Sequence, residues 1–182
     1  KSILEKKKIG KLYFIEMTYG NGTAKDIKNS NWKDKGDAVI NDLIPHLLDL
    51  NDYLFKIIPK YSKLSVKNRF ENKSTDYFNV LTSFKSITLD IKVSYLFWKN
   101  YFKIYISGAK GFISLNGLPK WGKCHLTYGK RIYPSGKPIM KTYNFKPVDN
   151  TWKKEINIFL NNKFKPFDLK KNIDIYNFIK KC

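Results

Sequence analysis

Two side chains that are suited to acid–base chemistry, Asp42 and His46, lie four residues apart in the segment Asp42-Leu-Ile-Pro-His46. Residues at i and i+4 of a helix stack on one side, so the carboxylate and the imidazole would point the same way. A neighbouring carboxylate also fixes the tautomer of an imidazole. The pair therefore predicts general acid–base chemistry at a hydroxyl or a carbonyl. The same spacing equally fits a hydrogen-bonded structural pair, and both interpretations stay open at this point.

The element that must position this pair is a helix, which we predict from Ala38 to Phe55. Its apolar residues cover most of the circumference, so we expect the helix to be largely buried. Pro45 lies inside it and should kink the helix immediately before His46. The polar residues follow the spacing 4, 3, 4 and fall in one narrow stripe: Asp42, His46, Asp49 and Tyr53.

The segment from Trp32 to Asp49 resembles the substrate domain of Gfo/Idh/MocA-type oxidoreductases. The shared pattern is Trp followed by Lys or Arg, a glycine-containing turn, and then Asp-x-x-x-His-x-x-Asp. The resemblance extends over nearly the whole chain. Its further parts are Lys8–Leu12 with the strand Tyr13–Tyr19 after it, Trp152–Phe159, Lys165-Pro-Phe-Asp168 and a last helix.

The resemblance implies an activity and a role for each matching residue. In the family, an N-terminal Rossmann domain binds NAD or NADP, and a C-terminal domain holds a sugar, nucleotide sugar, inositol or other polyol. A hydride moves between the substrate and the nicotinamide. Carried over by position, His46 would be the acid–base residue and Asp42 would orient the substrate or the proton relay. Trp32, Lys33 and Asp49 would contact the substrate.

The chain departs from the family pattern at two places near the pair. The family often has three glycines before the helix, whereas here Gly36 is followed by Asp37 and Ala38. The family usually has glycine two residues after the aspartate, where this chain has Ile44; a side chain there could narrow the space in which substrate meets nicotinamide. The alternative hypothesis is therefore a non-catalytic binding or oligomerisation domain that retains the fold.

The sequence has no signature of the cofactor-binding half. No Gly-x-Gly-x-x-Gly is present, which is the pattern by which a Rossmann domain binds a dinucleotide, and the family's Glu-Lys-Pro motif is also missing. Gly20-Asn-Gly22 follows a strand, but we predict a turn without a helix start at Thr23–Asp26. Ser2–Lys8 indicates the tail of a helix that began earlier. We therefore interpret residues 1–182 as a C-terminal substrate or oligomerisation domain, which we expect to bind no dinucleotide without its Rossmann domain.

The rest of the chain predicts an α+β fold: a large, mostly antiparallel open sheet with helices packed on one face. Short turns between the strands indicate hairpins. Helices are expected from Trp152 to about Asn162 and, capped by Asp168, to about Lys180. Aromatic residues on both faces near 95–105 fit either an ordinary core or a homo-oligomer interface through the open sheet face. Period-two patterning predicts strands at Leu64–Phe70, Tyr77–Lys85, Ile87–Phe97, Tyr101–Ser107, Gly111–Leu115, Cys124–Tyr128 and Met140–Phe145.

Composition excludes several classes of protein. The net charge of +20 suggests nucleic-acid binding, but Arg69 and Arg131 are the only arginines and the lysines are spread evenly, whereas phosphate contacts cluster. No apolar run approaches the roughly 20 residues of a membrane span. The two histidines and two cysteines form no metal-binding spacing, so no metal is expected. Cys124 and Cys182 fit free thiols in a reducing cytoplasm.

Overall fold

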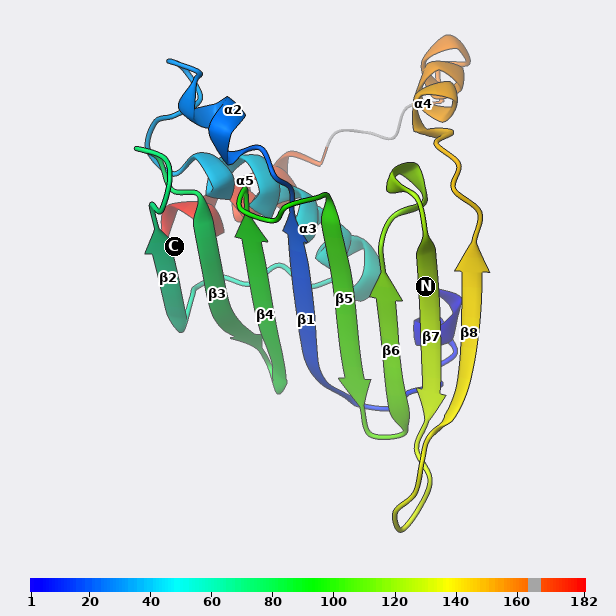
Figure 1. Ribbon diagram of the computed structural model, residues 1–182. Helices are drawn as coiled ribbons and strands as arrows, with labels where there is room; N and C mark the ends of the chain where they lie inside the picture. Colours follow the sequence, from blue (N-terminus) through cyan, green and yellow to red (C-terminus); the bar gives the residue numbers. More distant parts are fainter. Residues whose placement is uncertain (164–167) are drawn as a thin grey trace.

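The fold is built on one eight-stranded sheet with the order β2-β3-β4-β1-β5-β6-β7-β8 (Figure 1). The computed structural model of the chain describes residues 1–163 and 168–182. The α+β class and the mostly antiparallel open sheet are confirmed. The strands are β1 (Leu12–Gly20), β2 (Leu64–Asn68), β3 (Tyr77–Phe84), β4 (Ile87–Ser94), β5 (Tyr101–Gly108), β6 (Gly111–Asn116), β7 (Cys124–Lys130) and β8 (Ile139–Phe145).

The centre of the sheet is β1, which pairs in parallel with β4 and antiparallel with β5. Met17 of β1 lies between Ile91 of β4 and Ile104 of β5, and all three side chains are buried. Because side chains alternate between the faces of a strand, these rows form one apolar face. The predicted alternation in β4 is thereby confirmed, although the strand ends at Ser94 rather than at Phe97.

The long helix α3 (Ala38–Phe55) and the last helix α5 (Leu169–Lys180) lie behind the apolar face of the sheet (Figure 1). The core forms where α3 meets β1 and β4. Both ends of α3 match the prediction, and Pro45 lies inside it. The other helices are α1 (Ser2–Glu5), α2 (Ala24–Lys28), the 3-10 turn η1 (Pro119–Trp121) and α4 (Thr151–Leu160). No helix in the described residues is long and apolar enough to cross a membrane.

Two sequence predictions about helices are wrong. A helix, α2, begins at Ala24, where a turn without a helix start was expected. The helix α3 is also not buried around its circumference, because its fully buried residues lie on the face toward the sheet. Its polar stripe, which contains Asp42, His46 and Asp49, is exposed. Charged groups keep their hydration there, which avoids the cost of burying a carboxylate.

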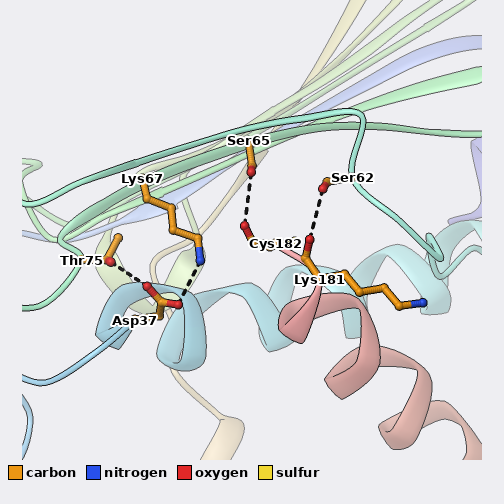
Figure 2. Close-up of polar contacts among 7 residues, drawn as sticks. All are labelled: Asp37, Ser62, Ser65, Lys67, Thr75, Lys181 and Cys182. Carbon is orange, nitrogen blue, oxygen red and sulfur yellow. Dashed lines mark hydrogen bonds and ion pairs between the residues drawn. The ribbon is translucent and has the colours of Figure 1, made fainter.

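The start of α3 is tied to the edge of the sheet through Asp37. Its carboxylate accepts hydrogen bonds from the ammonium of Lys67 at 3.0 Å and from the hydroxyl of Thr75 at 2.9 Å (Figure 2). Lys67 projects from β2 toward the helices, so it joins the first turn of α3 to the sheet. These contacts fix where the helix begins and hence where its exposed stripe faces.

The end of α5 is attached to the same edge. The hydroxyl of Ser65 donates to the backbone carbonyl of Cys182 at 3.2 Å, and that of Ser62 donates to the carbonyl of Lys181 at 3.4 Å (Figure 2). At its other end, α5 has the predicted cap, because the Asp168 carboxylate accepts a hydrogen bond from the backbone N–H of Lys171. The resemblance at 165–167 lies outside the described residues.

Candidate functional site

Asp42 is an exposed residue of α3, and its carboxylate accepts a hydrogen bond from a buried phenol. The hydroxyl of Tyr95, which directly follows β4, donates a hydrogen bond to Asp42 Oδ2 at 3.0 Å. The Tyr95 side chain is only 2% exposed. Its backbone is fixed as well, since its N–H donates to the carbonyl of Asp76 and its carbonyl accepts from Ala24. Burial and the charge of Asp42 raise the pKa of Tyr95, so the phenol remains a proton donor.

His46 lies one turn further along α3, on the same exposed face. Its ring meets the ring of Tyr19 edge-on, with centroids 6.2 Å apart. In the described part of the chain, no hydrogen bond or ion pair joins His46 to Asp42. Burial, followed by the charge of Asp42, raises the pKa of Tyr19, so a second neutral phenol borders the pair. Asp42 and His46 therefore lie on the same face of α3 and near the same phenol, without bonding to each other.

An aromatic ladder continues from His46 across the end of the sheet. Tyr19, near the end of β1, stacks on Trp121 of η1 with centroids 5.7 Å apart and meets Phe102 of β5 edge-on at 5.9 Å. Trp121 and Phe102 also line a hollow of about 280 Å³ between β5, β6 and β7. A group held in that hollow would lie next to the ladder that ends at His46.

Asp49, the third member of the polar stripe, bonds to the neighbouring helix. Its carboxylate forms an ion pair with the ammonium of Lys171 on α5, and Asp52 lies 3.6 Å from the same ammonium. The hydrogen bond to Asp49 is the main reason that the pKa of Lys171 is raised. This contact joins α3 to α5, and the role of Asp49 in binding substrate stays a prediction.

Trp32 and Lys33 lie on the loop before α3 and contact each other. Trp32 is 75% exposed, and the ammonium of Lys33 lies 5.0 Å from the centre of its ring. No described contact joins either residue to Asp42 or His46. The structure therefore brings together Asp42 and His46, while the substrate-binding roles of Trp32 and Lys33 stay predictions.

The side chain of Ile44 faces the sheet. It is fully buried and belongs to the apolar core beneath α3. The exposed surface that carries Asp42 and His46 lies on the other side of the helix. Ile44 thus fills the core and does not narrow the space around the pair.

The turn between β1 and α2 does not fit a pyrophosphate. Gly20 ends β1 and Gly22 follows it, at the place where a Rossmann domain would hold a pyrophosphate. A Cβ at Gly20 would lie 2.2 Å from the carbonyl oxygen of Ser94, and one at Gly22 would lie 2.7 Å from that of Phe97. Both glycines therefore serve close packing against the loop after β4, and α2 has only five residues.

Sequence reasoning missed three residues of this site: Tyr19, Tyr95 and Trp121. The first two appear in the sequence only as ordinary members of strand patterns. Trp121 lies in a short connection with no periodicity. The tertiary fold brings Tyr95 to Asp42, Tyr19 to His46 and Trp121 to Tyr19, and no local pattern reports such contacts.

Comparisons with known proteins identify a family for this chain and structures that share its fold. Residues 1–114 match the model of the GFO/IDH/MocA C-terminal domain. Among curated proteins, none matches the chain. Levoglucosan dehydrogenase in complex with NADH aligns with a TM-score of 0.64 and 16% identity over 81% of this chain and 43% of its own. An oxidoreductase from Agrobacterium radiobacter in complex with NAD+, L-tartaric acid and magnesium aligns with a TM-score of 0.69 and 16% identity over 99% of this chain and 56% of its own. The chain thus spans about half the length of these structures, and at this identity they show a shared fold.

Proposed function

Since the chain belongs to the Gfo/Idh/MocA family as a C-terminal domain, we propose that it is the substrate-binding and catalytic half of an NAD(P)-dependent oxidoreductase. The substrate would be a hydroxyl of a sugar, nucleotide sugar or other polyol. The observation that carries the proposal is the placement of Asp42 and His46 on one exposed face, with the Asp42 carboxylate held by the buried Tyr95 hydroxyl. A neighbour in fold, levoglucosan dehydrogenase, was solved with NADH and levoglucosan, which supports the choice of a sugar.

In this proposal each residue of the face has a separate role. His46 takes the proton of the substrate hydroxyl, or returns it in the reverse direction. Asp42 accepts a hydrogen bond from the substrate, and Tyr95 keeps its carboxylate in one orientation. Trp32 and Lys33 border the substrate from the loop before α3. Hydride exchange belongs to a nicotinamide that is held by another domain.

The first partner in this proposal is an N-terminal Rossmann domain. Support comes from surfaces that this chain leaves uncovered. No residue of α4 is buried, and Trp152, Ile156 and Leu160 are 73%, 55% and 71% exposed. Apolar side chains in such a row favour contact with another body.

A homo-oligomer through the open sheet face is the second expected assembly. This face carries a stack of three rings, in which Phe14 lies 5.9 Å from Tyr105 and Tyr105 lies 5.5 Å from Phe112. Light scattering of the purified protein at several concentrations tests this, since a monomer at all of them would refute it.

Cys124 and Cys182 are free thiols, which supports a cytoplasmic location.

The alternative is a non-catalytic binding or oligomerisation domain of the same fold. The absence of any described bond between Asp42 and His46 favours it. A pair that works together would place the carboxylate on the imidazole. In the alternative, substituting His46 would leave every activity of the protein unchanged.

The deciding experiment measures the reduced nicotinamide by its absorbance, using the chain joined to its Rossmann domain, NAD or NADP, and a panel of sugars and nucleotide sugars. His46→Ala should lower kcat by roughly 100-fold or more while the circular dichroism spectrum stays unchanged. The matched control is Tyr53→Phe, which lies on the same exposed stripe of α3 and should retain full activity. Equal activity of His46→Ala and the control would remove His46 from the chemistry.

A further inference from the structure

The hollow beside Trp121 differs in the charge of its lining from four other pockets of the described chain. It lies where β5 begins, β6 ends and β7 begins, and no carboxylate is among its described lining residues, which include Lys99, Lys123 and His125. Four other pockets each include at least one acidic residue in their described lining: Glu5, Glu16, Asp149, and Asp34 with Glu71. The chain has 15 acidic residues, and none of them is in the described lining of this hollow. The lining therefore contains no negative charge that would repel a bound anion.

The cations of the hollow are available for a ligand. Lys99 precedes β5 and Lys123 precedes β7, so they approach from two different loops. Both are exposed, and neither forms an ion pair within the described residues. Lys120 is outside this lining, and its ammonium lies 4.9 Å from the centre of the Trp121 ring. Asn100 and Asn116 add neutral amides to the same lining, and amides can bond to hydroxyl groups.

The loop that carries Trp121 is tightly built. Gly117 has a φ of +78°, and a Cβ there would lie 2.3 Å from the carbonyl oxygen of Lys123. The Gly117 N–H donates to the carbonyl of Phe102, and the Trp121 N–H donates to that of Leu118. The stack on Tyr19 adds a contact that holds the Trp121 ring, and a preorganised site lowers the entropy cost of binding.

We propose that this hollow is a subsite for the anionic group of an anionic sugar, either a phosphate or a carboxylate. The sugar ring would pack against Trp121, and its reacting end would extend along Tyr19 toward His46. Pockets of this kind combine an aromatic wall with a few polar groups that fix orientation, and lysine is a common binder of phosphate as a point charge. The placement of the sugar's reacting end at His46 rests on the proposed function. Binding of the anionic group in the hollow does not depend on catalysis.

The test follows the indole N–H signals of the 15N-labelled chain by NMR during titration with four probes. The probes are glucose 6-phosphate, glucuronate, glucose and inorganic phosphate. The chain has four tryptophans, and the signal of Trp121 is assigned as the one that disappears in Trp121→Phe. The two anionic sugars should shift this signal with saturation, glucose should bind more weakly, and a preference between the first two identifies phosphate or carboxylate.

A pair of double variants tests the role of charge. Lys99→Gln with Lys123→Gln should raise the Kd of the bound anionic sugar roughly tenfold, because two charge-assisted contacts are lost. The control removes the same charge at the opposite end of the sheet with Lys110→Gln and Lys130→Gln, and its Kd should stay within about twofold.

Two results would overturn the subsite. One is the absence of a saturable Trp121 shift with both anionic sugars; the other is an equal loss of affinity in the two double variants, which would indicate only the general positive charge. The titration measures binding in the absence of turnover. A failure of the proposed catalysis, seen as equal turnover of His46→Ala and its control, is therefore a different result from a failure of this subsite, seen in the Trp121 signal.

Discussion

Replacing Tyr95 by phenylalanine removes one hydroxyl and almost nothing else. The ring stays in its buried position, and Asp42 loses the hydrogen bond of 3.0 Å that the phenol donates. Hydrogen bonds to charged groups contribute about 1.5–3 kcal/mol to stability. Because the Asp42 carboxylate is exposed and water can replace the phenol, we expect Tyr95→Phe to lower the free energy of unfolding by only about 1 kcal/mol at pH 7.

At alkaline pH the sign of this effect should reverse. Burial and the charge of Asp42 raise the pKa of Tyr95 in the folded chain, whereas an unfolded tyrosine ionises near pH 10. The stability contributed by the bound proton is fully present below pH 10 and is lost as the pH rises above it. At pH 11 the ionisation of the unfolded phenol costs the wild type about RT ln 11, or about 1.4 kcal/mol. Phenylalanine has no such loss, so the variant should be about 0.4 kcal/mol more stable than the wild type.

The assay is urea unfolding, followed by circular dichroism under reducing conditions at pH 7 and pH 11. Taking the difference between variant and wild type cancels all other titrating groups. The control is Tyr13→Phe, whose exposed hydroxyl has no described hydrogen bond, and it should change stability by less than about 0.5 kcal/mol at pH 7. A difference between Tyr95→Phe and wild type that stays constant from pH 7 to pH 11 would refute the reasoning.

Three further substitutions test the surroundings of the site by urea unfolding. Ile44→Gly should cost about 3–5 kcal/mol, because it empties a fully buried position and adds a helical glycine; a loss below about 1 kcal/mol would contradict the buried placement. Burial alone would raise the pKa of Asp37, but hydrogen bonds from Lys67 and Thr75 lower it. The charged Asp37 carboxylate therefore adds to the free energy of unfolding above about pH 4, and this stabilisation is lost as the pH falls below that value. Asp37→Asn should remove this part of the acid destabilisation, which amounts to less than about 1 kcal/mol because the ion pair is exposed. Gly117→Ala should cost about 1–3 kcal/mol, because of the clash and the positive φ; wild-type stability would show that the loop relaxes freely.

Local patterns predicted the framework well. The alternation of Leu89, Ile91 and Val93 gave β4 its buried face, and the apolar run from Ala38 to Phe55 gave α3 both of its ends. These features depend on the period of side chains along a single element, and that period is written in the sequence. Capping by Asp168 belongs to the same class, since it joins residues three positions apart.

Contacts between distant residues could not be predicted in this way. The bond from Tyr95 to Asp42 spans 53 residues, and the stack of Trp121 on Tyr19 depends on the pairing of β1 with β5 and of β5 with β6. The exposure of the α3 stripe was also missed, because counting apolar residues around a helix does not reveal how many sides are covered. Only one side of α3 meets the sheet, so its polar residues stay hydrated on the other.

Because Asp42 and His46 are exposed, the proposed chemistry depends on a second domain that covers them. Two unit charges 4 Å apart interact by about 1 kcal/mol in bulk water and by about 4 kcal/mol at the lower effective dielectric near a protein surface. Asp42 and His46 face water in this chain, so as they stand they can add little to the stabilisation of a transition state. Catalysis at His46 therefore requires that another domain cover the face and exclude water. If no such cover forms, the same residues are a hydrated helix face, and the non-catalytic alternative accounts for all of their described contacts.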